Sequence, residues 1–204
     1  MQSSISFSAS SLVKSSASQI LYLSLKNERP RPTKAMLEGT HNQQQVSTSA
    51  FKEMRGIYTE YGITVFFCID EIQGTTLIEH KYIVGELPDW FLYQSIIQTA
   101  LYSALTHSVS KLETASFFVN LGNPKNYLDT RKVPYSSILK FTGNCLKTYK
   151  VECLDNAKLI KYFIDKALII ASKDFTKTRA YDTKHKFKDW EFLKSIISYS
   201  EQVN

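Results

Sequence analysis

The chain has 204 residues, of which 43% are hydrophobic, with only seven Gly and five Pro. This is enough to bury the core of one domain, and it excludes long flexible linkers. The net charge of +6 is uneven, because residues 1–121 hold nine Lys and Arg against ten Asp and Glu, whereas residues 122–204 hold sixteen against nine. The cationic surface is therefore expected in the C-terminal part.

The Ser-rich beginning predicts a helix that packs, not a targeting segment. It has neither the basic start nor the long apolar run of a secretory signal, and it lacks the Arg of a transit peptide. Apolar residues such as Leu12 and Leu21 suit a helix over 9–26, and a second helix is expected over 33–45. Three unpaired-looking Cys suit a reducing compartment, so a cytoplasmic or intracellular location is expected, in a host cell if the chain is viral.

Two β-rich runs predict a hairpin over residues 63–82. Residues 63–69 and 75–78 are rich in β-branched and aromatic side chains, which favour strands. Gln73-Gly74 between them suits a two-residue turn.

This hairpin would bring two carboxylates and a lysine together. With the Gln73-Gly74 turn, Asp70 lies opposite Leu77 and shares a face with Glu79 and Lys81. The diagonal distance from Asp70 to Glu79 is then about 7 Å, which one divalent cation can bridge. A turn longer by one residue would move Asp70 to the other face.

A Glu-x-Lys triplet alone is usually an ordinary solvent-facing pair. Here Phe66 and Cys68 precede Asp70 on one face, and Val65 and Ile69 line the other. Both faces are therefore expected to be covered, and charges that enter a covered strand need a partner or a metal.

A run of 21 residues without Asp, Glu, Lys or Arg follows, from Trp90 to Ser110. Pro88 and Asp89 suit a helix start. Gln94, Gln98 and Tyr102 recur at four-residue steps and form one polar stripe. The run is too polar for a membrane span, so it predicts a helix packed on the sheet.

Four elements follow one another in order: Gly39 with His41, then Asp70, then Glu79-His80-Lys81, then Gln98-x-x-x-Tyr102. This order resembles the RecB-type branch of the PD-(D/E)xK nuclease superfamily, and the Ser-rich segment 6–12 is similar to the start of its first helix. The resemblance implies an α/β fold, a restriction-endonuclease-like α/β/α core with a mixed central sheet flanked by helices.

The resemblance also implies a site. Its catalytic residues would be Asp70, Glu79, Lys81, Gln98 and Tyr102, and its metal ligands Asp70, Glu79, the backbone carbonyl of His80, and His41. Oxygen-rich ligands with one imidazole suit Mg²⁺ or Mn²⁺. The ring of His80 and the carboxylate of Glu71 are expected to point away from the carboxylate face.

Two departures from the family pattern stand out. The family often has Gly shortly before the Asp, where this chain has Phe67-Cys68-Ile69. Some relatives, the nucleases of CRISPR adaptation among them, hold an iron–sulfur cluster with four Cys. This chain has three Cys and no Cys-x-x-Cys, so no cluster is expected.

The C-terminal part carries a basic stretch interleaved with aromatic residues. Its cations are Lys173, Lys177, Arg179, Lys184, Lys186 and Lys188, and its aromatic residues are Phe175, Tyr181, Phe187 and Trp190. Cations that follow phosphates and rings that stack on bases suit single-stranded nucleic acid. A solvated lysine-rich face is the alternative.

The whole chain, 1–204, is expected to be one nuclease domain. It would comprise a helical part over 1–60, the hairpin and the Gln-x-x-x-Tyr helix over 61–121, and the basic part over 122–204. Further elements are expected as strands at 116–121 and 148–154, helices at 156–172 and 189–198, and a lid or DNA-contacting loop within 122–144.

These patterns predict a divalent-metal-dependent DNA nuclease that prefers single strands or ends, in replication, recombination or repair. DNA is the expected partner, without a membrane, and a homo-oligomer is left open. Two alternatives are a viral-type RNA endonuclease, which uses His, Asp and Glu-x-Lys in the same order, and a non-catalytic nucleic-acid-binding protein on a nuclease fold.

Overall fold

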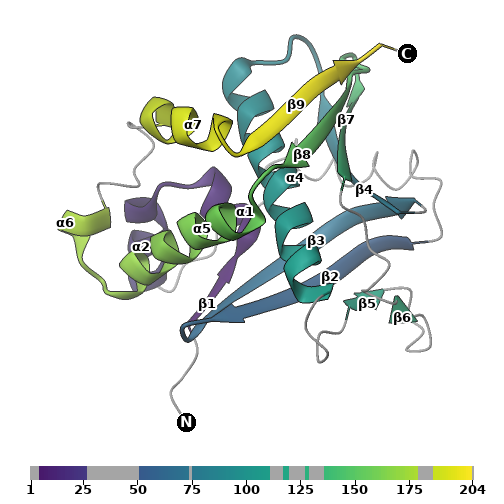
Figure 1. Cartoon of the computed structure of the whole chain (residues 1–204). Helices are drawn as coiled ribbons and strands as arrows, with labels where there is room; N and C mark the ends of the chain where they lie inside the picture. Colours follow the sequence, from purple (N-terminus) through teal and green to yellow (C-terminus); the bar gives the residue numbers. More distant parts are fainter. Residues whose placement is uncertain are drawn as a thin grey trace.

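The computed structural model of the chain describes residues 5–26, 51–73, 75–110, 117–119, 127–128, 136–178 and 186–203. In this part of the chain a mixed nine-stranded sheet is flanked by helices (Figure 1). The strands are β1 (Ile5–Ser8), β2 (Phe51–Glu60), β3 (Ile63–Gln73), β4 (Thr76–Ile83), β5 (Phe117–Val119), β6 (Tyr127–Leu128), β7 (Ser136–Gly143), β8 (Thr148–Cys153) and β9 (Ile197–Gln202). The helices are α1 (Ala9–Lys14), α2 (Ala17–Leu25), α4 (Asp89–Ser110), α5 (Asn156–Ala171), α6 (Phe175–Thr178) and α7 (Lys186–Lys194).

The sheet has the strand order β6-β5-β2-β3-β4-β7-β8-β9, and β1 pairs with β3 beside this path. The pairs β1–β3 and β4–β7 are parallel, and the other pairs are antiparallel. Strands β1 and β4 therefore pair with the same edge of β3. Strand β1 pairs with its first residues and β4 with its last residues.

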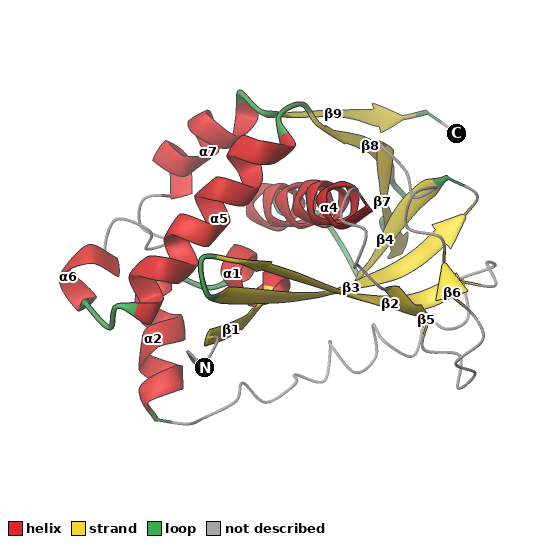
Figure 2. Ribbon diagram, turned by 60° about the horizontal axis from the view of Figure 1, so that its bottom comes forward, coloured by secondary structure: helices red, strands yellow, loops and turns green. Residues whose placement is uncertain are grey.

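The sheet curves around helix α4. This helix contacts β2, β3, β4, β7, β8 and β9, and Figure 2 shows it between β2 and β3 on one side and β8 and β9 on the other. Its first turn is fixed by Pro88, whose carbonyl accepts hydrogen bonds from the N–H groups of Phe91 and Leu92, both at 3.0 Å. Any polar side chain on the sheet-facing side of α4 is consequently enclosed.

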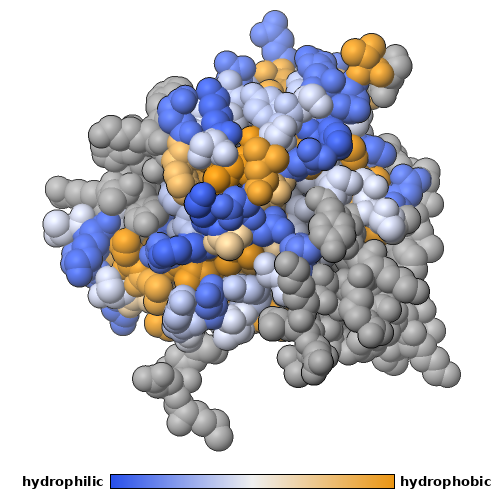
Figure 3. Space-filling model, in the orientation of Figure 1, coloured by the Kyte–Doolittle hydropathy of each residue, from blue (hydrophilic) through white to orange (hydrophobic). Residues whose placement is uncertain are grey.

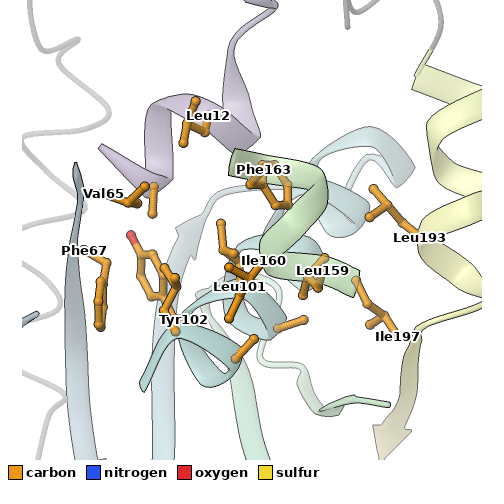
Figure 4. Close-up of a cluster of buried hydrophobic side chains, with 14 of the residues drawn as sticks. Leu12, Val65, Phe67, Leu101, Tyr102, Leu159, Ile160, Phe163, Leu193 and Ile197 are labelled. Atoms are coloured by element: carbon orange, nitrogen blue, oxygen red, sulfur yellow. The ribbon is translucent and has the colours of Figure 1, made fainter. Parts of the chain in front are cut away.

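The hydrophobic core lies where α1, α4 and α5 meet β3. Leu12 of α1, Leu101 of α4, and Ile160 and Phe163 of α5 are buried together with Val65 of β3 (Figure 4). Helix α5 begins at an N-cap, since the Asp155 side chain accepts a hydrogen bond from the N–H of Lys158 at 3.0 Å. Among the described helices, none combines the length and the apolar character that a membrane span requires.

The structure confirms the α/β class, the helix-flanked mixed sheet and most of the expected elements. The hairpin over 63–82, the helix over 90–110, the strands at 116–121 and 148–154 and the helix at 156–172 are all present to within a few residues. This arrangement is consistent with an α/β/α core.

Several expected elements were wrong. The single helix over 9–26 is broken at Ser15-Ser16, because the Ser16 side chain accepts a hydrogen bond from the N–H of Gln19 and starts α2 anew. The part expected to be helical over 1–60 also contains strands β1 and β2. The expected helix over 33–45 lies outside the described residues.

The C-terminal half differs as well. A lid or DNA-contacting loop was expected within 122–144; residues 122–126 and 129–135 lie outside the described residues, and residues 136–143 form β7, which pairs with β4 along its length. The expected helix over 189–198 ends at Lys194, and Ile197 already belongs to β9. Both strands are short runs whose place in the sheet is set by tertiary pairing, which the sequence pattern does not contain.

Gly56 of β2 lies against the ring of Phe67 on the neighbouring strand, and a Cβ at this position would overlap that ring. Phe67 is buried and packs against Tyr102 with 6.1 Å between ring centroids. We therefore expect Gly56→Ala to destabilise the fold by about 1–3 kcal/mol in urea denaturation, because the ring must move within a packed core. In a Phe67→Leu background the same substitution should cost clearly less. An equal cost in both backgrounds would mean that the overlap is not the cause.

Candidate active site

The candidate site lies where β1 and β4 share the edge of β3. Pairing with β1 ends at Phe66, and pairing with β4 begins at Glu71, so residues 67–70 separate the two partners on this edge. Asp70 lies at the end of this interval. Its carboxylate accepts a hydrogen bond from the backbone N–H of His80 on β4, at 2.8 Å. A side chain therefore links β3 to β4 just beyond the last backbone pair.

The observed register of β3 and β4 differs from the expected one, but it leaves Asp70 and Glu79 on the same face. Ile72 pairs with Leu77 and Gln73 with Thr76, so Asp70 is not opposite Leu77. Continued by one pair beyond Glu71 and Ile78, this register sets Asp70 opposite Glu79. A shift by two residues preserves the side-chain alternation, so Asp70 stays on the face of Glu79, and the two are directly opposite instead of diagonal.

Glu79 is enclosed between β4 and α4 and is only 2% exposed. Its Oε1 accepts hydrogen bonds from Lys81 Nζ and from Gln98 Nε2, the latter at 2.7 Å. Gln98 in turn donates to the hydroxyl of Tyr102 at 2.9 Å. Asp70, Glu79, Lys81, Gln98 and Tyr102 are thus brought together as the sequence predicted.

Two buried oxygens of this cluster have no hydrogen-bond partner among the described residues. They are Oε2 of Glu79 and Oε1 of Gln98. Because a buried oxygen without a partner loses its hydration without compensation, such an atom points to a ligand or a water molecule. The chemistry of the pair, a carboxylate and an amide oxygen, suits a hard cation or a hydrogen-bond donor.

Burial dominates the electrostatics of the site. Burial, followed by the negative charge of Asp70, raises the pKa of Glu79 to about 7, against the opposing effect of Lys81 and Lys14. Burial, followed by the charges of Glu79 and Asp70, also raises the pKa of Tyr102 well above its ordinary value. The Tyr102 hydroxyl is consequently a neutral group at any physiological pH.

The opposite face of β4 carries a second buried polar pair. Nε2 of His80 lies 2.7 Å from Oε2 of Glu71, and both residues are buried. This confirms that the His80 ring and Glu71 point away from the Glu79 face.

The two faces of β4 are both covered. On β3, however, Phe66 is 45% exposed, so the expectation that both faces of β3 are covered was wrong.

Lys14 is a member of the cluster that sequence reasoning missed. It is the last residue of α1, and its charge interacts with those of Lys81, Glu79 and Asp70. One signal could have found it, since Lys14 is the only charged residue among the first 25.

The basic stretch is only partly within the described part of the chain. Lys173 and Lys177 are exposed beside α6, and Nζ of Lys177 lies 3.6 Å from Asp174. Helix α6 and strand β4 lie at opposite ends of the molecule in Figures 1 and 2, so these two lysines do not adjoin the Asp70–Glu79 pair. Arg179 and Lys184, like His41, lie outside the described residues, as do the side chains of Lys186 and Lys188.

The aromatic residues of that stretch are not all available for stacking. Trp190 is buried and stacks on Tyr93 of α4, with ring centroids 4.3 Å apart. Its expected role beside nucleic-acid bases is therefore wrong, whereas Phe175 is 46% exposed. On the face seen in Figure 3, hydrophobic and hydrophilic residues are interspersed.

The three cysteines lie on separate elements. Cys68 is on β3, Cys145 follows β7, and Cys153 ends β8, and none of the three forms a disulfide. Burial raises the pKa of the Cys153 thiol to about 11, which disfavours its reactive thiolate.

Comparison of the chain with protein-family models, curated proteins and solved structures finds no match.

The raised pKa of Glu79 makes a prediction for the metal-free protein. Because the pKa in the folded state, about 7, lies above the ordinary value of 4.5, the folded state favours the protonated carboxyl. The stability from this group is present below pH 4.5 and is lost as the pH rises through 7. We expect urea denaturation in EDTA to show a decline in unfolding free energy on the order of 1 kcal/mol or more between pH 5 and pH 8.

Glu79→Gln should flatten that decline, since the amide does not ionise. The matched control is Glu152→Gln on β8, whose carboxylate is exposed and pairs with Lys150 at 2.7 Å. A decline of wild-type size in Glu79→Gln would assign the pH dependence to another group.

Proposed function

We propose that this chain is a divalent-metal-dependent nuclease that hydrolyses phosphodiester bonds in DNA, with a preference for single strands or ends, in replication, recombination or repair. The observation that carries the proposal is the Glu79 carboxylate. It is buried opposite Asp70, one of its oxygens is held by Lys81 and Gln98, and the other has no partner among the described residues. Two carboxylates can hold a divalent metal, and a neighbouring lysine can neutralise charge on a phosphate, so this arrangement suits metal-dependent phosphodiester hydrolysis.

The donor set fits Mg²⁺ or Mn²⁺. Asp70 and Glu79 would hold the ion, because both metals prefer carboxylate oxygens and Oε2 of Glu79 needs a partner. The carbonyl of His80 and the ring of His41 would complete the ligands in the resemblance to RecB-type nucleases. Within the described residues, no group of three or more His, Cys, Asp and Glu is arranged to hold a metal, and in this proposal the further ligands would be backbone oxygens, water and His41. When bound, the ion would supply an activated water and neutralise charge on the phosphate.

The other residues would act around that centre. The side chain of Lys81 is 11% exposed, so its ammonium lies at the border between the buried carboxylate and solvent. From there it would orient the attacking water or neutralise the charge that develops on the phosphate. Gln98 would hold Glu79 in one rotamer, and Tyr102, itself bonded to Gln98, would keep the amide turned toward the carboxylate.

A nuclease assay tests the proposal. We expect wild-type protein to degrade single-stranded DNA with Mg²⁺ or Mn²⁺ but not with EDTA, and Asp70→Asn, Glu79→Gln and Lys81→Met each to lose roughly 100-fold or more of the rate. Linear and circular single strands, duplex DNA and RNA in parallel would separate exonuclease from endonuclease activity and DNA from RNA preference.

The chain supplies a matched control for these variants. Lys150 and Glu152 on β8 form an ion pair with the same two-residue spacing as Glu79 and Lys81, but both side chains are more than 40% exposed. Lys150→Met and Glu152→Gln should therefore keep wild-type activity. Binding of DNA without cleavage by wild type, under every metal condition, would favour a non-catalytic binding protein instead.

Loss of the support around Glu79 should have a smaller effect. We expect Gln98→Leu and Tyr102→Phe to lower the turnover rate about 10-fold while Mn²⁺ still raises the melting temperature, because the carboxylates remain. Tyr93→Phe is the control, since Tyr93 is on the same helix but stacks on Trp190. If either variant abolishes stabilisation by Mn²⁺, the residue acts on the metal itself.

A further inference from the structure

Lys14 is placed at the candidate site by the path of the chain. Strand β1 pairs with β3 up to Phe66, and α1 begins at the next residue of the chain, Ala9. Helix α1 therefore starts beside the 67–70 interval of β3, and it contacts both β3 and α4. Lys14 ends this helix, and its charge interacts with Asp70, Glu79 and Lys81.

Three hydrogen bonds from two side chains hold the end of α1. Gln94, one turn before Gln98 on the polar stripe of α4, donates through Nε2 to the carbonyl of Lys14 at 3.5 Å. The buried Lys166 of α5 donates to the carbonyls of Leu12 and Ser15, the latter at 2.9 Å. A cation at the C-terminal end of a helix also matches the helix dipole. The backbone of Lys14 is thus fixed from both sides.

The Lys14 side chain itself has no hydrogen bond or ion pair with the rest of the described chain. Lys81, by contrast, donates to Glu79. Burial and then the charge of Lys81 lower the pKa of Lys14 to about 8. The residue as a whole is exposed. The result is a solvent-accessible ammonium that lies beside another cation without neutralising a particular carboxylate.

The charge balance of the site indicates what such an ammonium can bind. Ionised Asp70 and Glu79 balance Lys81 and Lys14. A divalent cation would therefore give the cluster a charge of about +2, which attracts an anion that carries its charge on exposed oxygens. A phosphodiester has two non-bridging oxygens, and two lysines on different elements can contact it from two sides.

We propose that Lys14 is a second substrate-contacting cation of this site, which binds a backbone phosphate of the nucleic acid beside Lys81. The inference rests on the proposed nuclease function for its substrate class. It differs from the expected C-terminal binding surface, because Lys14 ends α1, whereas Lys177 belongs to α6 and Lys173 precedes that helix.

The test compares Lys14→Gln and Lys14→Arg with Lys26→Gln. Lys26 is an exposed cation at the end of the next helix, 4.5 Å from the ring centroid of Tyr22, and serves as the matched control. We expect Lys14→Gln to lower kcat/KM on single-stranded DNA roughly 10- to 100-fold, and Lys14→Arg to retain most of the activity. Lys26→Gln should match wild type.

A binding measurement separates a phosphate contact from a structural role. With Ca²⁺ in place of Mg²⁺, the slope of log affinity against log salt concentration should fall by about 0.7 in Lys14→Gln, as expected for one lost contact to a single strand. The melting temperature of this variant should stay within about 2 °C of wild type, because the residue is exposed. If Lys14→Gln is less stable than wild type, Lys14→Arg provides the second test. Recovery of both the salt slope and the activity in Lys14→Arg would support the phosphate contact.

The outcomes distinguish the two proposals. Cleavage by wild type together with an unchanged kcat/KM and salt slope in Lys14→Gln overturns the role of Lys14 and leaves the nuclease intact. Absence of cleavage by wild type overturns the proposed nuclease function. The salt slope of Lys14→Gln then tests the phosphate contact of Lys14 by itself. Absence of both cleavage and binding by wild type overturns both.

Discussion

The edge of β3 is the constraint on which the candidate site depends. A strand has one neighbour on each edge, and here one edge is divided between β1 and β4. The parallel strand β1 pairs with β3 up to Phe66 and is followed by α1. The antiparallel strand β4 pairs with residues 71–73 of β3. Asp70 lies between these two arrangements, and its carboxylate binds the N–H of His80. Sheet topology, and not a loop, thus positions the first acidic group.

The buried carboxylate of Glu79 is the unfavourable part of this arrangement. Removing an ionised carboxylate from water destabilises the folded state unless cations and donors compensate. Lys81 and Gln98 compensate one oxygen, and the other remains without a partner among the described residues. A site that is electrostatically incomplete in the unliganded protein is characteristic of groups retained for binding or catalysis.

Which residues lie together was predicted better than the register between their strands. The alternation of β3 and β4 and the four-residue steps of Gln94, Gln98 and Tyr102 are local patterns, and both are observed. The register was wrong by two residues, because the sequence pattern alone does not determine which residues of the two strands pair. Because a shift by two residues does not change the face on which a side chain lies, the expectation that Asp70 and Glu79 share a face was unaffected.

Lys14 shows what strand alternation and helix periodicity could not provide. It lies on α1, far from the hairpin in sequence, and it meets the carboxylates only because β1 pairs in parallel with β3. The break between α1 and α2 and the strands β7 and β9 were missed for the same reason. Each is determined by a cap or by a distant partner, and not by hydrophobic periodicity.

The pairing of β4 with β7 bears on how the protein acquires its site during synthesis. Ile78 pairs with Ile138, a separation of 60 residues, whereas the backbone pairs between β4 and β3 cover only the three residues next to the turn. Such long-range parallel pairing forms slowly, because the loop must close before the strands can bind. The strand with Glu79 and Lys81 gains its long-range partner only after residue 143 has left the ribosome. Until then the nascent chain carries the two charged residues on a poorly supported hairpin, so the cluster around Glu79 forms late, when most of the chain has been made.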